Sequence, residues 1–180
     1  MRRMSKSILG YILFFFIQVY SFAQNSPDIP KKSTFSADYM MGTYLLLDDV
    51  DYKSVILNGF RLGIKPGNRV AYQLEYLIGS QEDRTGITGT THTANIHILY
   101  YLDDRSGKFS PYLYGGGGFF EFKDFSRDKL GVALNAGVGT EVNFSDKIAA
   151  LAEFRYINLG PLNLQGTHQI GVLWGIRLNI

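Results

Sequence analysis

Seven charged residues occupy alternate positions, as on one face of a strand. They share that face with glycine, asparagine and glutamine rather than with apolar residues. Packing acidic and basic side chains together on one side of a sheet favours hydrogen-bonded ion pairs, because an unpaired charge in a confined space is very costly. We predict that six of them form a polar network that plugs an interior. The seven are Asp38, Arg61, Glu75, Glu141, Glu153, Arg155 and Arg177, and the predicted network comprises all of them except Asp38.

Other residues offer less chemistry. His92 and His97 are five positions apart, so on one strand they point to opposite faces and cannot share a metal ion without a bulge. There is no cysteine, which excludes disulfides and thiolate metal sites. A nucleophile needs its base within hydrogen-bond reach, and no such pair is visible. We therefore expect no catalytic residue, no metal site and no cofactor.

Two further stretches have compositions that ligand sites share. The acidic segment 48–51 (D-D-V-D) could hold Ca²⁺ or bridge to lipopolysaccharide through divalent ions, although a solvated loop is the commoner use of such a segment. The glycine run 115–118 matches a phosphate-binding loop only in composition, because no Lys-Ser/Thr and no predicted helix follow it. Glycines in a strand more often allow close packing and curvature.

Strands must position the charged residues, and the last thirteen residues show the pattern most clearly. From His168 to Ile180 every second residue is apolar, and the residues between are small or polar with one exception. Because side chains alternate sides along a strand, this segment has one apolar and one polar face. Similar alternation predicts eight strands, at about 34–46, 54–64, 70–81, 92–102, 109–122, 130–144, 148–156 and 168–180.

The eight strands predict an all-β fold, an eight-stranded antiparallel up-and-down transmembrane β-barrel. Tight turns at 65–69, 103–108 and 145–147 alternate with somewhat longer connections, as in outer-membrane barrels. A soluble barrel of lipocalin type has the same strands with its polar face outside. The charges decide between the two, because they share the glycine-rich face and leave the opposite apolar rows almost uncharged, which suits lipid.

The N-terminus carries an export pattern. Residues 1–23 combine Arg2, Arg3 and Lys6, an apolar run and a small-x-small site, which predicts a cleaved signal peptide rather than a membrane anchor. Residues 24–33 then form a short periplasmic leader, and the barrel domain spans 34–180. Cleavage leaves 15 basic and 16 acidic residues, a formal charge of −1, so nucleic acid is not an expected partner.

Several stretches resemble the small outer-membrane β-barrel family of OmpA/OmpX-like and opacity-type proteins. These are F-R-L-G-I-K-P-G-N-R, P-Y-L-Y-G-G-G-G-F, A-G-V-G-T-E-V-N-F-S-D-K, L-A-E-F-R-Y and the final H-Q-I-G-V-L-W-G-I-R-L-N-I. The resemblance implies a location in the cell outer membrane and contact with its lipids and lipopolysaccharide. It also implies recognition by the barrel-assembly machinery, whose signal is expected at Trp174, Ile176, Leu178 and Ile180. Family members usually end on Phe or Trp, and this chain ends on Ile180.

The resemblance leaves three functions open. The first is a non-enzymatic protein with a structural, envelope-integrity or interaction role, its lumen plugged by polar side chains and its protein partner unknown. The second is a narrow porin-like channel for small solutes. The third is a lipid A-modifying enzyme, which the sequence disfavours: family deacylases carry a His-x-Ser motif on a late strand, and the corresponding stretch here reads R-Y-I-N-L-G, residues 155–160.

Overall fold

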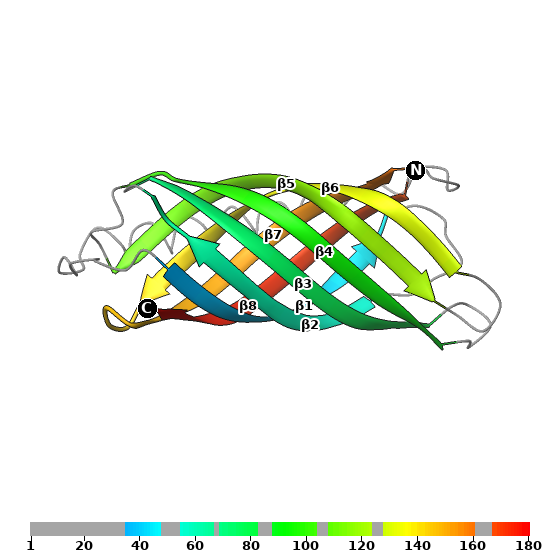
Figure 1. Ribbon diagram of the computed structural model, residues 1–180, viewed down its shortest axis with the longest axis horizontal. Helices are drawn as coiled ribbons and strands as arrows, with labels where there is room; N and C mark the ends of the chain where they lie inside the picture. The colour runs from blue at the N-terminus through cyan, green and yellow to red at the C-terminus, as the bar shows by residue number, and fades with distance from the viewer. Residues whose placement is uncertain are drawn as a thin grey trace, which may run out of the picture.

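The computed structural model describes residues 35–47, 55–66, 69–82, 88–103, 108–123, 128–160 and 167–180. These residues form eight antiparallel strands that follow one another in chain order around a closed barrel (Figure 1). The fold predicted from the alternation is therefore confirmed. The strands are β1 (Phe35–Leu46), β2 (Val55–Ile64), β3 (Val70–Glu82), β4 (Thr88–Tyr101), β5 (Phe109–Lys123), β6 (Asp128–Asn143), β7 (Ile148–Gly160) and β8 (Thr167–Asn179).

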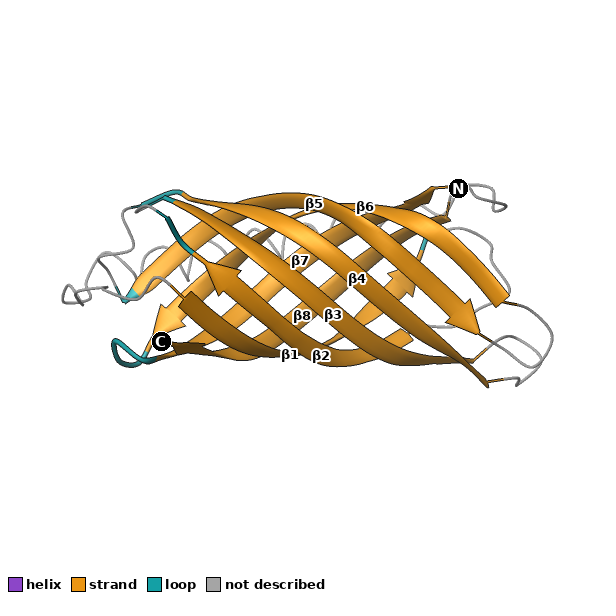
Figure 2. Cartoon of the chain, viewed as in Figure 1, coloured by secondary structure: helices purple, strands orange, loops and turns teal. Residues whose placement is uncertain are grey.

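Closure joins the first strand to the last. Ser36 of β1 is the register partner of Asn179 of β8, and the pairing continues to Leu46 and Gln169. No sheet edge stays open in such an arrangement, as a lipid-exposed sheet requires. The secondary-structure view contains only strands and short connecting segments among its coloured parts (Figure 2). Within the described ranges, no helix has the length and apolar character needed to cross a membrane.

The strands extend further than predicted at the end of the barrel opposite Phe35 and Asn179 (the remote end). The Thr-rich segment that begins at Thr88 pairs with β3 instead of forming a loop, and β7 continues to Gly160. The connections 47–54, 83–87, 124–127 and 161–166 at this end consequently differ little in length from 65–69, 102–108 and 144–147 at the other. The predicted difference in connection length was therefore wrong, because polar threonines still pair along a ladder.

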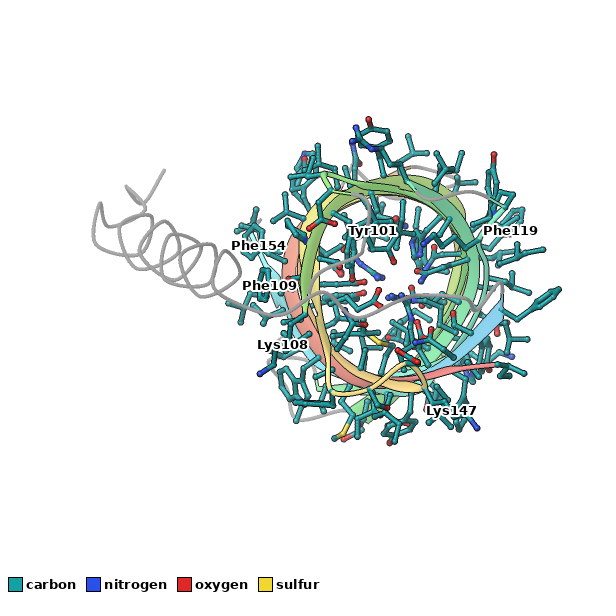
Figure 3. The ribbon with its side chains drawn as sticks, turned by 90° about the vertical axis from the view of Figure 1, so that its left-hand side faces the viewer. Tyr101, Lys108, Phe109, Phe119, Lys147 and Phe154 are labelled. Carbon is teal, nitrogen blue, oxygen red and sulfur yellow. The ribbon has the colours of Figure 1, made fainter. Side chains whose placement is uncertain are left out.

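The two faces of the wall differ in chemistry. Outward rows are apolar, with Ile96, Phe60 and Trp174 about half exposed or more. Among the strand residues whose burial the structure describes, the outward acidic and basic side chains are Glu121 and Lys123, close to the end of β5 that leads into the connection 124–127. Figure 3 looks along the barrel, with Tyr101 directed into the lumen and Phe119 directed away from it. The outer rows are thus suited to lipid and the inner rows to polar packing.

The glycines of the β5 run 115–118 differ in how much space surrounds them. A Cβ added at Gly118 would collide with the backbone oxygen of Ala94 and the Cα of Asn95, whereas one at Gly115 has only the backbone oxygen of Asn135 at 3.9 Å. Gly118 therefore allows β4 and β5 to approach closely beneath the Asn95 side chain. This is the ordinary strand use of glycine that the sequence favoured over a phosphate loop.

This difference predicts the outcome of a one-carbon substitution. Gly118→Ala should lower the free energy of unfolding by about 1–3 kcal/mol, the usual cost of overpacking, because backbone atoms must shift. Gly115→Ala should leave it almost unchanged. Urea unfolding of both variants in detergent micelles measures the difference, and equal stability of the two would contradict this account of the glycines.

Candidate functional site: a charge network in the lumen

Arg155 lies at the centre of the lumen and is fully buried. Its guanidinium makes two parallel bonds to Glu75, with Nη1 donating to Oε1 at 2.7 Å and Nη2 to Oε2 at 2.8 Å. Nη2 also donates to Glu153 at 3.1 Å, while Nε and Nη1 donate to the hydroxyls of Tyr114 and Tyr44 at 3.0 and 2.9 Å. An arginine has five N–H donors, and these five bonds match that number.

Arg61 completes a ring with the same two carboxylates. Its Nη1 and Nη2 donate to Glu153 at 2.6 and 3.0 Å, and Nη2 also donates to Glu75 at 2.7 Å. Each glutamate therefore contacts both arginines, and the ring of two cations and two anions is electrically balanced. Charge-assisted bonds of this kind are among the strongest hydrogen bonds that side chains form.

Arg177 forms a second cluster nearer the end of the barrel at which β1 begins and β8 ends. Its Nε and Nη2 donate to the two oxygens of Asp38 at 2.8 and 2.7 Å, and its Nη1 donates to Glu141 at 2.8 Å. The hydroxyl of Tyr101 accepts from Nη1 at 3.0 Å and donates to Glu141 at 3.1 Å. Asp38 also lies 4.0 Å from Arg61, so the two clusters adjoin.

Strand register explains how distant residues meet. Asp38 is paired with Arg61 of β2 on one side and with Arg177 of β8 on the other. Arg61 is in turn paired with Glu75 of β3. These four residues follow one line of cross-strand neighbours, while Glu153, Arg155 and Glu141 reach them across the lumen from β7 and β6. Every one of the six residues predicted for the network lies in this arrangement.

The network also contains tyrosines that were not predicted from the sequence. Tyr44, Tyr101, Tyr112 and Tyr114 all point inward, and Tyr112 donates to Glu153 at 2.7 Å. On β5 Tyr112, Tyr114, Phe120 and Phe122 face the lumen, whereas Phe119 faces outward. Gly137 and Gly139 of β6 make room for the rings of Tyr114 and Tyr112, which lie against them. The signal available in the sequence was this placement of glycines at the cross-strand positions.

Amide and imidazole groups border the ring on β4. Asn95 donates to Glu75 at 3.2 Å and accepts from Asn135 at 3.3 Å. His97 is buried, with Nε2 at 4.0 Å from Glu75, and neither ring nitrogen has a hydrogen-bond partner. Buried polar groups of this sort commonly bind ordered water.

An apolar layer accompanies the charged clusters. Ten buried residues form it. Most of them lie in the half of the barrel opposite Phe35 and Asn179. The members are Met40, Tyr44, Val55, Leu57, Leu77, Phe120, Ala133, Leu151, Ile157 and Leu173. An eight-stranded barrel has an interior just wide enough for side chains to fill. The charged clusters and this apolar layer both lie in the described lumen, and Figure 3 shows side chains that point into the barrel from its wall.

The remaining candidates lie elsewhere. His92 points outward and His97 inward, as their spacing predicted, and the described residues contain no group of three or more metal-ligating side chains. Glu153 faces the lumen, so it cannot assist a reaction on the lipid side. Trp174, Ile176, Leu178 and Ile180 form an outward apolar row. The predicted signal peptide, the leader and the acidic segment 48–51 lie outside the described residues.

A closed barrel with an apolar exterior and a charged interior is typical of small integral outer-membrane barrels. Residues 12–175 match the family model described as "Outer membrane protein beta-barrel domain". The chain therefore belongs to that outer-membrane family, which also places it in the outer membrane. No curated protein matches the sequence at a significant level.

Solved structures of the same fold are distant in sequence. Neisserial surface protein A is 14% identical, with a TM-score of 0.70, over 82% of this chain and 98% of that one. OprG from Pseudomonas aeruginosa is 12% identical, with a TM-score of 0.57, over 85% and 99%. The N-terminal barrel domain of Pseudomonas aeruginosa OprF is 15% identical, with a TM-score of 0.52, over 82% and 100%. At these identities the likeness concerns the fold alone.

Proposed function

We propose that this protein is a non-enzymatic outer-membrane barrel with a structural, envelope-integrity or interaction role, its lumen closed by the charge network. The observation that carries the proposal is the ring of Arg61, Glu75, Arg155 and Glu153, whose charged groups contact one another at 2.6 to 3.1 Å. A solute crossing the lumen would have to separate these ion pairs. Breaking a buried ion pair costs several kcal/mol, which opposes passage.

The proposal includes an orientation and a route. The signal peptide 1–23 is cleaved after export, the leader 24–33 lies in the periplasm, and both chain ends of the barrel then face the periplasm. In this orientation the barrel end with the connections 47–54, 83–87, 124–127 and 161–166 faces the cell exterior. The outward row of Trp174, Ile176, Leu178 and Ile180 serves as the signal for the barrel-assembly machinery, and the partners in the membrane are its lipids and lipopolysaccharide.

A narrow channel is the second candidate. The specific observation in its favour is the set of buried polar atoms without a partner on the inner face, including Gln73 Oε1, both nitrogens of His97 and Asn135 Oδ1. Such atoms could line a path for water beside the ion pairs. Lipid A modification has less support, because the stretch 155–160 reads R-Y-I-N-L-G and lacks the His-x-Ser motif of family deacylases. Mass spectrometry of lipid A from cells with and without the protein tests it.

Liposome swelling distinguishes the closed barrel from the channel. We expect liposomes that contain the protein to swell in isotonic arabinose or glycine no faster than protein-free liposomes, because in this proposal the charge network closes the lumen. A general porin reconstituted at the same protein-to-lipid ratio is the positive control. Swelling that is fast and graded by solute size would contradict the closed lumen and favour the channel.

A further inference from the structure

A groove of about 220 Å³ lies on the outer wall of the barrel, across β3 to β6. Its floor is Ala94, whose cross-strand partners Tyr76 and Phe119 form the two sides. Phe119 and Leu130 are about 60% exposed, so they present apolar surface to the surroundings. On this lipid-facing wall, the small Ala94 side chain between two aromatic rings leaves space in the groove for one acyl chain.

Polar groups gather where the groove approaches the remote end of the strands. The Tyr76 hydroxyl is hydrogen-bonded to Nδ1 of His92 at 2.7 Å. His92 is paired in register with Glu121, and Glu121 lies 2.9 Å from the ammonium group of Lys123. The groove is thus apolar along its length, and at its end a tyrosine–histidine pair and the Glu121–Lys123 ion pair supply hydrogen-bond donors, which matches an amphiphile that carries a phosphate.

The barrel contains a second tyrosine–histidine pair that serves as an internal comparison. Tyr156 and His168 contact each other on β7 and β8 in the same diagonal relation as Tyr76 and His92. Beside Tyr156 the position equivalent to Ala94 is Ile170, and the cross-strand neighbour of Ile170 on β1 is Leu45 rather than an aromatic residue. The first pair thus adjoins a small residue, and the second adjoins a branched one.

We propose that the groove binds a phosphorylated glycolipid of the outer leaflet. One acyl chain lies on Ala94 between Tyr76 and Phe119, and the headgroup phosphate accepts hydrogen bonds from Lys123 and from Nε2 of His92. Glu121 positions the Lys123 ammonium, and the hydroxyl of Tyr76 orients the His92 ring. The assignment to the outer leaflet rests on the orientation in the proposed function, which puts this end of the barrel at the cell exterior.

Photocrosslinking tests the site. The probe is lipid A with a diazirine in an acyl chain, added at low mole fraction to phosphatidylcholine nanodiscs that hold the full barrel, with crosslinks mapped by mass spectrometry. We expect crosslinks to concentrate on Phe119 and Leu130. Ala94→Ile should reduce them to the level of the rest of the barrel wall, because it reproduces the arrangement at Ile170. Lys123→Ala should reduce them with diphosphorylated probe but not with dephosphorylated probe, whereas His168→Ala should change nothing.

Three results would overturn the proposal: crosslinks spread evenly around the barrel, an Ala94→Ile variant that crosslinks like the wild type, or an equal yield from a diazirine phosphatidylglycerol probe. The folded state of each variant is checked by heat-modifiable gel mobility. The swelling assay on the same preparations keeps the two proposals separate. If crosslinking fails while the lumen stays closed, the lipid site is wrong and the proposed function stands.

Discussion

Replacing Arg155 by methionine should lower the free energy of unfolding by about 3–5 kcal/mol, the cost of removing one partner of a buried ion pair. The variant loses all five bonds of the guanidinium. Glu75 then keeps Arg61 as its arginine partner and becomes a buried carboxylate with too little compensation. Methionine fills much of the same volume, so the loss reflects charge and hydrogen bonding rather than a cavity.

Two matched variants sharpen this prediction. Lys147→Met removes a cation from an exposed turn and should cost almost nothing. Arg155→Lys keeps the charge but cannot make the paired bonds to Glu75, so it should fall between methionine and the wild type. Urea unfolding in lipid vesicles can be followed by the fluorescence of Trp174, the single tryptophan, which faces outward. Equal stability of the Arg155→Met and Lys147→Met variants would contradict a structural role for the network.

An arginine placed at Ile96 should destabilise the barrel by about 2–4 kcal/mol, the cost of a basic side chain at the bilayer midplane. Ile96 lies near the middle of β4 and is 62% exposed. Its outward neighbours in register are Leu74 and Gly117, so no carboxylate is beside it to form a pair. The expected loss therefore comes from lipid contact and not from packing within the protein.

Thr88→Arg is the control for this substitution. Thr88 also faces outward on β4, but it lies at the end of the strand, where the cost of a charge falls to about 0–1 kcal/mol. The same vesicle unfolding assay, repeated in vesicles of thinner bilayers, should bring the two variants closer together. A loss as large at Thr88 as at Ile96 would show that the outer rows of β4 do not lie in the bilayer as described.

Much of this fold could be predicted from the sequence because the side-chain period of a strand is two. Once the charges of β2, β3, β7 and β8 fell on one row, the faces of those strands were determined. The prediction of a charged interior used only this property. Inward Arg61, Arg155 and Arg177 lie where the alternation puts them, and each is buried.

On strand β5 the alternation of side chains does not by itself tell which face points into the lumen. Phe109 to Lys123 has a charge at Glu121 and Lys123 but none within its central part, and aromatic residues occur on both rows. Without a charge to mark the inner row, the sequence does not tell which face Tyr112 and Tyr114 occupy. Their inward direction follows from Gly137 and Gly139 on the neighbouring strand, and this requires the register of β5 with β6.

The partners within the network also depend on closure. Asp38 and Arg177 are separated by almost the whole described chain, and they meet because β1 pairs with β8. The bonds from Arg155 to Glu75 and Tyr44 cross the lumen and depend on strand tilt as well as register. Alternation along one strand carries no information about tilt, so the composition of the site was predictable and its connectivity was not.

The most direct test of the closed lumen is the single-channel conductance of purified, heat-modifiable protein in planar lipid bilayers. With the ring of Arg61, Glu75, Arg155 and Glu153 intact, we predict that the wild type gives no large, steady conductance in molar KCl. Uniform, long-lived current steps from the wild-type barrel, scaling with salt concentration as expected for a water-filled pore, would contradict the account.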